Sequence, residues 1–153
     1  MLQNDYLMRI IFQMVEILRK SLREERTDPS ASSAELEQSL ANAVDMEPSL
    51  FFSLAPESMV TLLSLGDFDS RLAPYLVRGM ALDAELLEQS GRADTASLRR
   101  SQLDSLARAY GLEVTEADLD TQAIAEFLDG QVESESDEPL DWQETISGSS
   151  EIG

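Results

Sequence analysis

The sequence predicts an all-α fold of five to six helices. Apolar residues recur at spacings of three and four in several segments, and proline, glycine or small polar residues bound each of these segments. The chain has 153 residues, of which 42% are hydrophobic, and this is enough to build one core of ordinary size. These observations predict a single helical domain over residues 1–130.

The longest predicted helix covers residues 5–23 (DYLMRIIFQMVEILRKSLR). Polar residues follow one another along it at intervals of 4, 3, 4 and 3, which places them in one narrow stripe. They are Arg9, Gln13, Glu16, Lys20 and Arg23. Apolar residues fill the rest of the circumference, about 240°, whereas an ordinary surface helix buries roughly 100°. We therefore expect this helix to be central in the fold and covered on two sides.

The next elements are short. Ser32 and Glu35 form a capping-box pattern, which predicts a helix over residues 33–45. The apolar segment 50–54 lies between two prolines, which excludes a long helix and a central strand, so we expect one buried helical turn there. Pro56 suits the first position of a short helix that follows this turn.

A long helical hairpin is predicted over residues 74–110. Gly91 can take the left-handed conformation that ends its first helix, and the connection is so short that the two helices must pack antiparallel. We expect the hairpin to cover one side of helix 5–23, and residues 50–65 to cover the other. The polar side chains of the second helix should lie mainly away from its buried side. They are Arg99, Arg100, Gln102 and Arg108.

A last helix and a tail complete the chain. Thr115 and Asp118 offer a cap for the helix, and Gly130 is expected to end it. From residue 131 onward Ser, Glu, Asp and Gly dominate, so this segment cannot offset the entropy cost of ordering itself. We therefore predict an acidic, disordered tail over residues 131–153.

Charge and composition exclude several classes of function. A net charge of −19 repels phosphate backbones and anionic lipid headgroups, so we expect no nucleic-acid or membrane binding, and partners should be basic or apolar. The sequence has no histidine and no cysteine, and so lacks the commonest general base near neutral pH and the two most versatile zinc ligands. We therefore expect no enzyme activity and assign no catalytic residue, cofactor or metal ligand.

Two patterns have a chemical interpretation beside a structural one. The triplet Asp-Ser-Leu at residues 104–106 is also found in acyl carrier proteins, but Ser105 is expected inside an amphipathic helix rather than at a helix start. Acidic residues over 118–129 have much of the spacing of a calcium loop, but Ala123 stands where that loop needs a glycine. The favoured interpretations are a plain helix and a solvated acidic helix face.

The opening of the chain resembles a known family. Residues 4–9 (NDYLMR), followed by a mostly apolar helix, are similar to the start of an uncharacterised bacterial family of small helical proteins, and this resemblance covers residues 3–23. In that family a leading helix precedes a hairpin similar to a tetratricopeptide repeat. The small and apolar residues of the repeat have matching positions here at Ala84, Leu87, Gly91 and Ala96. Arg100 departs from the repeat's aromatic residue, and no second copy follows at 34 residues. The resemblance implies a helical interaction scaffold and brings no catalytic residue.

These observations together predict a cytoplasmic, non-enzymatic protein–protein interaction scaffold, in which a long first helix packs on a tetratricopeptide-like hairpin. The N-terminus lacks the basic region of a signal peptide, and its apolar run is too short to span a membrane. The partner is another protein or, in a homodimer, a second copy bound through the first helix. The candidate partner-binding residues are Met8, Ile11, Phe12, Val15, Leu18 and, in the acidic tail, Trp142.

The alternative function is a helical pocket for a small apolar ligand. Its lining would be Met8, Phe12, Phe51, Phe52 and Met80.

Overall fold

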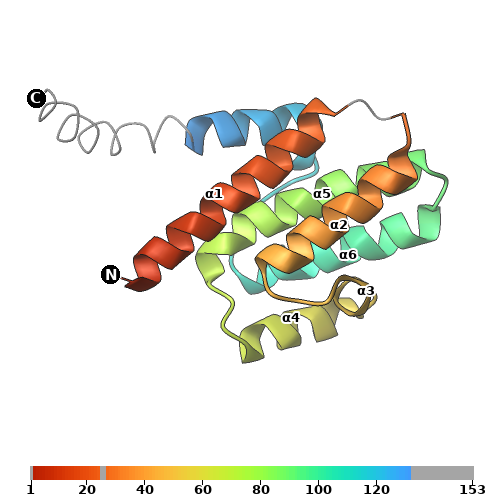
Figure 1. The fold of residues 1–153 in the computed structure, drawn as a ribbon. Helices are drawn as coiled ribbons and strands as arrows, with labels where there is room; N and C mark the ends of the chain where they lie inside the picture. Colours follow the sequence, from red (N-terminus) through yellow and green to blue (C-terminus); the bar gives the residue numbers. More distant parts are fainter. Residues whose placement is uncertain (1, 25–26, 132–153) are drawn as a thin grey trace, which may run out of the picture.

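The computed structural model describes residues 2–24 and 27–131, and within these ranges every regular element is helical (Figure 1). The α-helices are α1 (Leu2–Arg23), α2 (Pro29–Ala43), α3 (Pro48–Phe51), α4 (Pro56–Leu65), α5 (Ala73–Gln89), α6 (Ala93–Ala109) and a last helix over 121–131. The 3₁₀ helices are η1 (Ser70–Leu72) and η2 (Ala117–Leu119). The prediction of an all-α fold is thus confirmed for the described residues. Their seven α-helices are one more than the largest number predicted.

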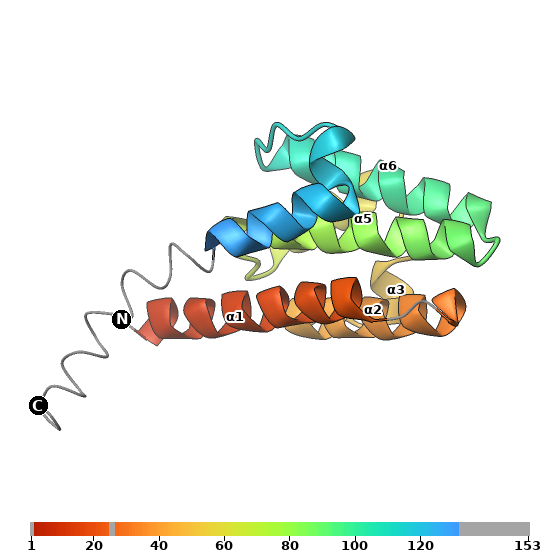
Figure 2. The ribbon, with the colours of Figure 1, turned by 90° about the horizontal axis from the view of Figure 1, so that it is seen from above.

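Helix α5 is the centre of the fold. In Figures 1 and 2, α1 and α2 lie side by side, α5 packs behind them, and α6 lies behind α5. The short turn at Gly91, whose φ is 81°, makes α5 and α6 an antiparallel pair. Buried residues occur all around α5, whereas the buried residues of α1 form one stripe. The prediction that the first helix is the central one is therefore wrong.

The cover of α1 also differs from the prediction. Helix α1 packs on α2 and α5, while α4 packs on α6. The buried residues of α1 are Leu7, Ile11, Met14, Val15 and Leu18. Met8 and Phe12 beside this stripe are 39% and 47% exposed, so the helix buries much less than the expected 240°. An apolar side chain can remain in water at the edge of a stripe, because burying every apolar residue is not a condition of folding.

A glycine sets the distance between α5 and the two helices in front of it. A Cβ atom on Gly79 would lie 2.7 Å from Cδ2 of Leu40 in α2 and 3.2 Å from Cδ2 of Leu18 in α1. Leu40 and Leu18 are fully buried, so their side chains fill the space that any other residue at position 79 would need. The close contact of α1, α2 and α5 therefore depends on the missing side chain at this position.

Helix α2 begins earlier than the capping box predicts. Its N-cap is Asp28, whose Oδ1 accepts a hydrogen bond of 3.2 Å from the backbone N–H of Ala31, and Pro29 occupies the first turn. Ser32 is thus inside the helix, and the neighbouring Ser33 is buried. The prediction from Ser32 failed because two cap signals lie four residues apart, and the chain uses the first one.

The last described helix also has different ends. Asp118, expected in its cap, lies within η2, whereas Asp120 is the residue that caps helix 121–131. The backbone N–H of Ala123 donates to Oδ1 of Asp120 at 2.8 Å. Gly130 lies within the helix rather than ending it. Of the predicted tail, only residue 131 falls within the described residues, and it is helical.

Candidate functional site

A buried arginine joins three helices. The side chain of Arg99 in α6 is only 2% exposed. Its Nε donates a hydrogen bond of 2.8 Å to Oδ2 of Asp83 in α5, and its Nη2 donates one of 2.7 Å to Oε2 of Glu37 in α2. A guanidinium carries five N–H donors in a rigid planar arrangement, so a single side chain can hold groups from several directions. Arg99 therefore fixes α2, α5 and α6 relative to one another.

The same cluster holds the connection between α3 and α4. Nη1 of Arg99 donates to the backbone oxygen of Phe52 at 2.9 Å and to Oε1 of Gln102 at 2.6 Å. Nε2 of Gln102 in turn donates to the backbone oxygens of Phe52 and Leu54, at 3.0 and 2.7 Å. The Arg99 guanidinium also lies over the ring of Phe52, 4.6 Å from its centroid. The backbone that links α3 to α4 is therefore anchored from the interior.

The two carboxyl groups of the cluster differ in protonation. Desolvation and the neighbouring Glu37 raise the pKa of Asp83 to about 8, although hydrogen bonds from Ser33, at 2.6 Å, and from Arg99 oppose the shift. Partial burial acts to raise the pKa of Glu37 as well, but its hydrogen bond with Asp83 and the Arg99 charge lower it overall. At neutral pH Asp83 is therefore mostly protonated, and the single charges of Glu37 and Arg99 balance. This avoids an uncompensated charge in the low-dielectric interior.

This cluster is a structural element, because a substrate cannot reach it. Asp83 and Gln102 are fully buried, and their hydrogen bonds are made within the chain. The prediction that Arg99 and Gln102 lie away from the buried side of their helix is wrong. Their spacing of three residues, in line with Leu103 and Leu106, places them on the apolar side and could have indicated this. Sequence reasoning gave too much weight to charge.

The largest exposed apolar side chains outside α1 lie on α3 and α4. Leu50 is 57% exposed and Leu65 is 80% exposed. They border an open hollow of about 380 Å³. Its lining comprises Leu50, Leu54, Glu57, Ser58, Thr61, Leu62 and Leu65, which we call the leucine groove. Sequence reasoning missed this surface because it expected the segment 50–65 to cover α1.

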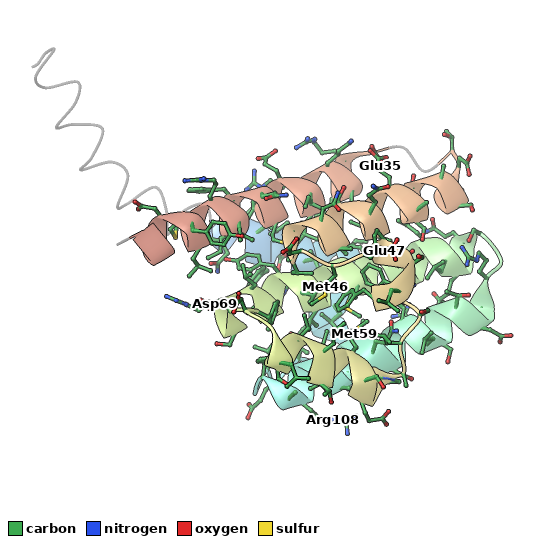
Figure 3. The ribbon with its side chains drawn as sticks, turned by 60° about the horizontal axis from the view of Figure 1, so that its bottom comes forward. Glu35, Met46, Glu47, Met59, Asp69 and Arg108 are labelled. Atoms are coloured by element: carbon green, nitrogen blue, oxygen red, sulfur yellow. The ribbon has the colours of Figure 1, made fainter. Side chains whose placement is uncertain are left out.

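Helix α4 buries one face and leaves Leu65 exposed on the other, beside the exposed polar residues Glu57, Ser58, Thr61 and Ser64. Met59, labelled in Figure 3, is fully buried on the inner face, which packs on α6. Leu63 is fully buried as well. Leu65 lies on the outer face and is 80% exposed, whereas Leu62 beside it is partly buried against the core. Contiguous exposed apolar patches larger than a few hundred Å² are rare on monomeric soluble proteins and mark interaction sites. The outer face of α4 is therefore the best candidate for a binding surface among the described residues.

The groove lies in an acidic part of the chain. The segment 46–70 contains four acidic residues and no lysine or arginine. Glu47, labelled in Figure 3, caps α3 by accepting a hydrogen bond of 2.8 Å from the backbone N–H of Leu50. The hydrogen bond from the Ser49 hydroxyl, and then the one from Leu50, lower the pKa of Glu47. Glu57 lies within the groove lining itself. The lining of the leucine groove therefore carries negative charge next to its leucine side chains.

A second and larger hollow has a different character. It measures about 790 Å³ and lies between α5, α6 and the segment 114–120. Small side chains such as Ala81 and Ser97 line it together with acidic residues and Arg100, which forms an ion pair of 3.1 Å with Glu88. We call it the acidic hollow. Its lining is more polar than that of the leucine groove.

The predicted partner-binding residues fall into three groups. Met8 and Phe12 are exposed on α1 and accessible to a partner. Ile11, Val15 and Leu18 are buried in the core of the chain itself, so the folded protein does not present them. Trp142 lies outside the described residues. Only two residues of the predicted set are thus shown to be on the surface.

The residues predicted to line a pocket for a small ligand are also separated. Phe51, Phe52 and Met80 are buried in the hydrophobic core, whereas Met8 and Phe12 lie on the surface of α1. The five side chains therefore do not surround a common space. Their spacing in the sequence reflected ordinary core packing in three of the five cases.

Other features of the described chain bear on its chemistry. Ser105, of the triplet shared with carrier proteins, is half-buried in the middle of α6. Within residues 2–24 and 27–131, no three acidic side chains come together in a way that could hold a metal ion. The described helices include none long and apolar enough to cross a membrane.

No family model matches the chain, and neither a curated protein nor a solved structure matches it.

Proposed function

We propose that this protein is a non-enzymatic, cytoplasmic interaction scaffold that binds a partner protein in the leucine groove. The observation that supports this most directly is the exposure of Leu50 and Leu65 on a backbone that Arg99 and Gln102 hold from the interior. A surface fixed in this way loses little conformational entropy when it binds. Apolar area supplies the affinity, and the buried cluster supplies the rigidity.

The shape of the groove favours a protein partner over a small ligand. Sites for small molecules enclose most of the ligand surface, typically about 70–90%. The leucine groove is an open hollow of about 380 Å³ in which Leu65 is 80% exposed, so a small apolar molecule would remain largely in water. A longer segment of protein would cover all four leucines at once. The function as an interaction scaffold therefore ranks above the small-ligand alternative.

The proposal extends to the architecture. The α5–α6 hairpin has features of a tetratricopeptide hairpin, namely a short turn at Gly91 with positive φ and buried small or apolar residues at Ala84, Leu87 and Ala96. Together with the opening residues of α1, they support membership of the bacterial helical family that the sequence resembles. Proteins built from such hairpins expose surfaces for other proteins.

A second surface could serve the same function. Met8 and Phe12 are exposed on α1, and this face is the candidate for the homodimer predicted from the sequence. Light scattering of the full chain at several concentrations tests it. A dimer that the Phe12→Glu change dissociates supports the α1 face, and a concentration-independent monomer contradicts it.

The experiment that tests the groove is affinity purification of the full chain from its native cell with quantitative mass spectrometry. Three baits are compared, namely the wild type, Leu65→Glu and Phe12→Glu. Both changes lie on exposed apolar residues, so each should alter the stability by less than about 0.5 kcal/mol. Urea unfolding of each bait checks this assumption.

The outcomes are distinct. A partner that is retained by the wild type and by Phe12→Glu, but lost with Leu65→Glu, supports binding in the leucine groove. If a partner is lost only with Phe12→Glu, the binding surface is on α1 and not in the leucine groove. If no protein depends on either residue, the interaction function proposed for these surfaces is wrong.

A further inference from the structure

We propose that the occupant of the leucine groove is an amphipathic α-helix of another protein, with leucine-like side chains on one face and lysine or arginine beside them. This inference rests on the function proposed above and specifies its partner. It follows from three properties of the groove, namely the spacing of its lining residues along α4, the absence of a free backbone edge and the sign of its charge.

The spacing of the groove residues fits a helix. Ser58, Thr61 and Leu65 follow one another at intervals of 3 and 4, so they form one ridge along the outside of α4, and Leu50 and Leu54 of the preceding segment lie beside it. Helices bind such surfaces by inserting side chains at positions i, i+3, i+4 and i+7. The hydroxyl of Thr61 already donates to the backbone oxygen of Glu57 at 2.9 Å, so it needs no bond from the partner.

The backbone of α3 and α4 excludes an extended peptide that would bind by strand addition. That mode needs a row of unpaired N–H and C=O groups at the edge of a sheet. The walls of the groove are helices, whose backbone groups are bonded within the helix, and the connection between them is held by Gln102. A helical partner satisfies its own backbone and needs only side-chain contacts.

The charge of the groove selects a basic partner. The segment 46–70 has four acidic residues and no basic one. The cations that follow in η1 and α6 are engaged already, because Arg71 pairs with Asp69 at 2.9 Å and Arg108 pairs with Asp104. Asp69 is neutralised by its pair with Arg71, so lysine or arginine beside the apolar face of the partner would meet chiefly the carboxylate of Glu57 in the groove lining. Complementary potentials of this kind raise the association rate and suppress wrong partners.

The same argument excludes two other occupants. The segment 131–153 of this chain has seven acidic residues and no basic one, and a second copy carries a net charge of −19. Either would bring like charge to the groove, which is unfavourable. The partner is therefore a basic segment of a different protein.

The test uses designed peptides and the full chain. The first peptide is a helix-forming sequence with leucine at i, i+3, i+4 and i+7 and lysine at the remaining surface positions. The second has glutamate in place of lysine, and the third has the composition of the first in an order without an apolar face. Fluorescence anisotropy at two salt concentrations measures binding to the wild type and to two variants. One variant is Leu65→Glu, and the other is Glu116→Gln with Asp120→Asn, which alters the acidic hollow instead.

The expected result is that the lysine peptide binds the wild type and binds Leu65→Glu at least about tenfold more weakly, the effect of losing one central apolar contact. The glutamate and scrambled peptides should bind at least about tenfold more weakly than the lysine peptide. Added salt should weaken the binding of the lysine peptide. The acidic-hollow variant should bind like the wild type.

Three results would overturn the inference. Equal affinity of the lysine and glutamate peptides would show that the groove does not select a basic partner. Equal affinity of the ordered and scrambled peptides shows unspecific attraction to an acidic protein. Loss of binding in the acidic-hollow variant alone places the site there. If the native-cell experiment still finds a partner that depends on Leu65, the proposed function stands while this description of the partner fails. If it finds none, the function itself fails.

Discussion

The Nε atom of Arg99 donates a hydrogen bond of 2.8 Å to Oδ2 of Asp83, and both side chains are buried. One residue comes from α6 and the other from α5, so the bond lies inside the helical hairpin at the centre of the fold. The same guanidinium also reaches Glu37 of α2 and the backbone oxygen of Phe52. The buried cluster therefore holds, from the inside, the backbone segment that carries the leucine groove on its outside.

Replacement of Arg99 should be among the most damaging single changes. We expect Arg99→Leu to lower the free energy of unfolding by about 3–5 kcal/mol, because Glu37 and Asp83 would lose the buried guanidinium that donates to both of them. Arg100→Leu is the matched control, since Arg100 pairs with Glu88 at the surface and should contribute less than about 1 kcal/mol. Urea unfolding followed by circular dichroism compares them. Equal losses would contradict the role assigned to Arg99.

The buried carboxyl of Asp83 should make the stability depend on pH. Its pKa rises from 3.8 to about 8 in the folded chain, so between these values the folded state binds more protons than the unfolded state. The unfolding free energy contributed by this group therefore falls as the pH rises from about 4 to 8. The lowered pKa of Glu37 acts in the opposite sense, but only below about 4.5, where protonation removes its contribution.

The measurement is urea unfolding at pH 5 and at pH 8. The wild type should lose more than about 1.4 kcal/mol over this range, the equivalent of one pKa unit. Asp83→Asn keeps the shape of the side chain without the titration and should abolish most of this loss. Asp94→Asn, an exposed position, serves as the control and should keep the wild-type slope. An unchanged slope in Asp83→Asn would show that Asp83 does not hold the proton.

Gly79 should tolerate no side chain without repacking. Alanine normally stabilises a helix by up to about 1 kcal/mol relative to glycine. At Gly79 the new Cβ would lie 2.7 Å from Leu40, so we expect Gly79→Ala to cost about 1–3 kcal/mol. Gly130→Ala, with no atom within 4 Å of the new Cβ, should be neutral or slightly stabilising. Thermal unfolding of both variants decides this, and Leu40→Val should reduce the cost of Gly79→Ala if the contact is its cause.

The orientation of α1 predicts that the loss of stability caused by an aspartate depends on the position at which it is introduced. Leu18→Asp places a charge in the core and should cost more than about 3 kcal/mol. Gln13→Asp and Phe12→Asp lie on exposed positions and should each change the stability by less than about 1 kcal/mol. Chemical denaturation of the three variants provides the comparison. A large loss with Phe12→Asp would mean that a partner or a second copy buries that side of the helix.

Local signals explain what could be predicted from this sequence. The all-α fold, the start of α4 at Pro56, its stop at Gly66 and the turn at Gly91 follow from residues that act on their own backbone. Proline fixes φ and removes a backbone donor, whereas glycine can adopt the positive φ that other residues avoid, so each acts on the backbone where it stands. Competing local signals were harder to resolve, as the cap at Asp28 shows.

The tertiary structure decided which apolar faces pair and which remain in water. Leu63 and Leu65 are the same residue type on one helix, yet the packing of α4 on α6 buries Leu63 and leaves Leu65 exposed. The burial of Arg99 likewise depends on acceptors that lie 16, 47 and 62 residues away. A side chain is buried or exposed according to the segments that meet it in space. The sequence by itself therefore determined the helices, while the long-range contacts among α2, α4, α5 and α6 determined the core, the buried cluster and the groove.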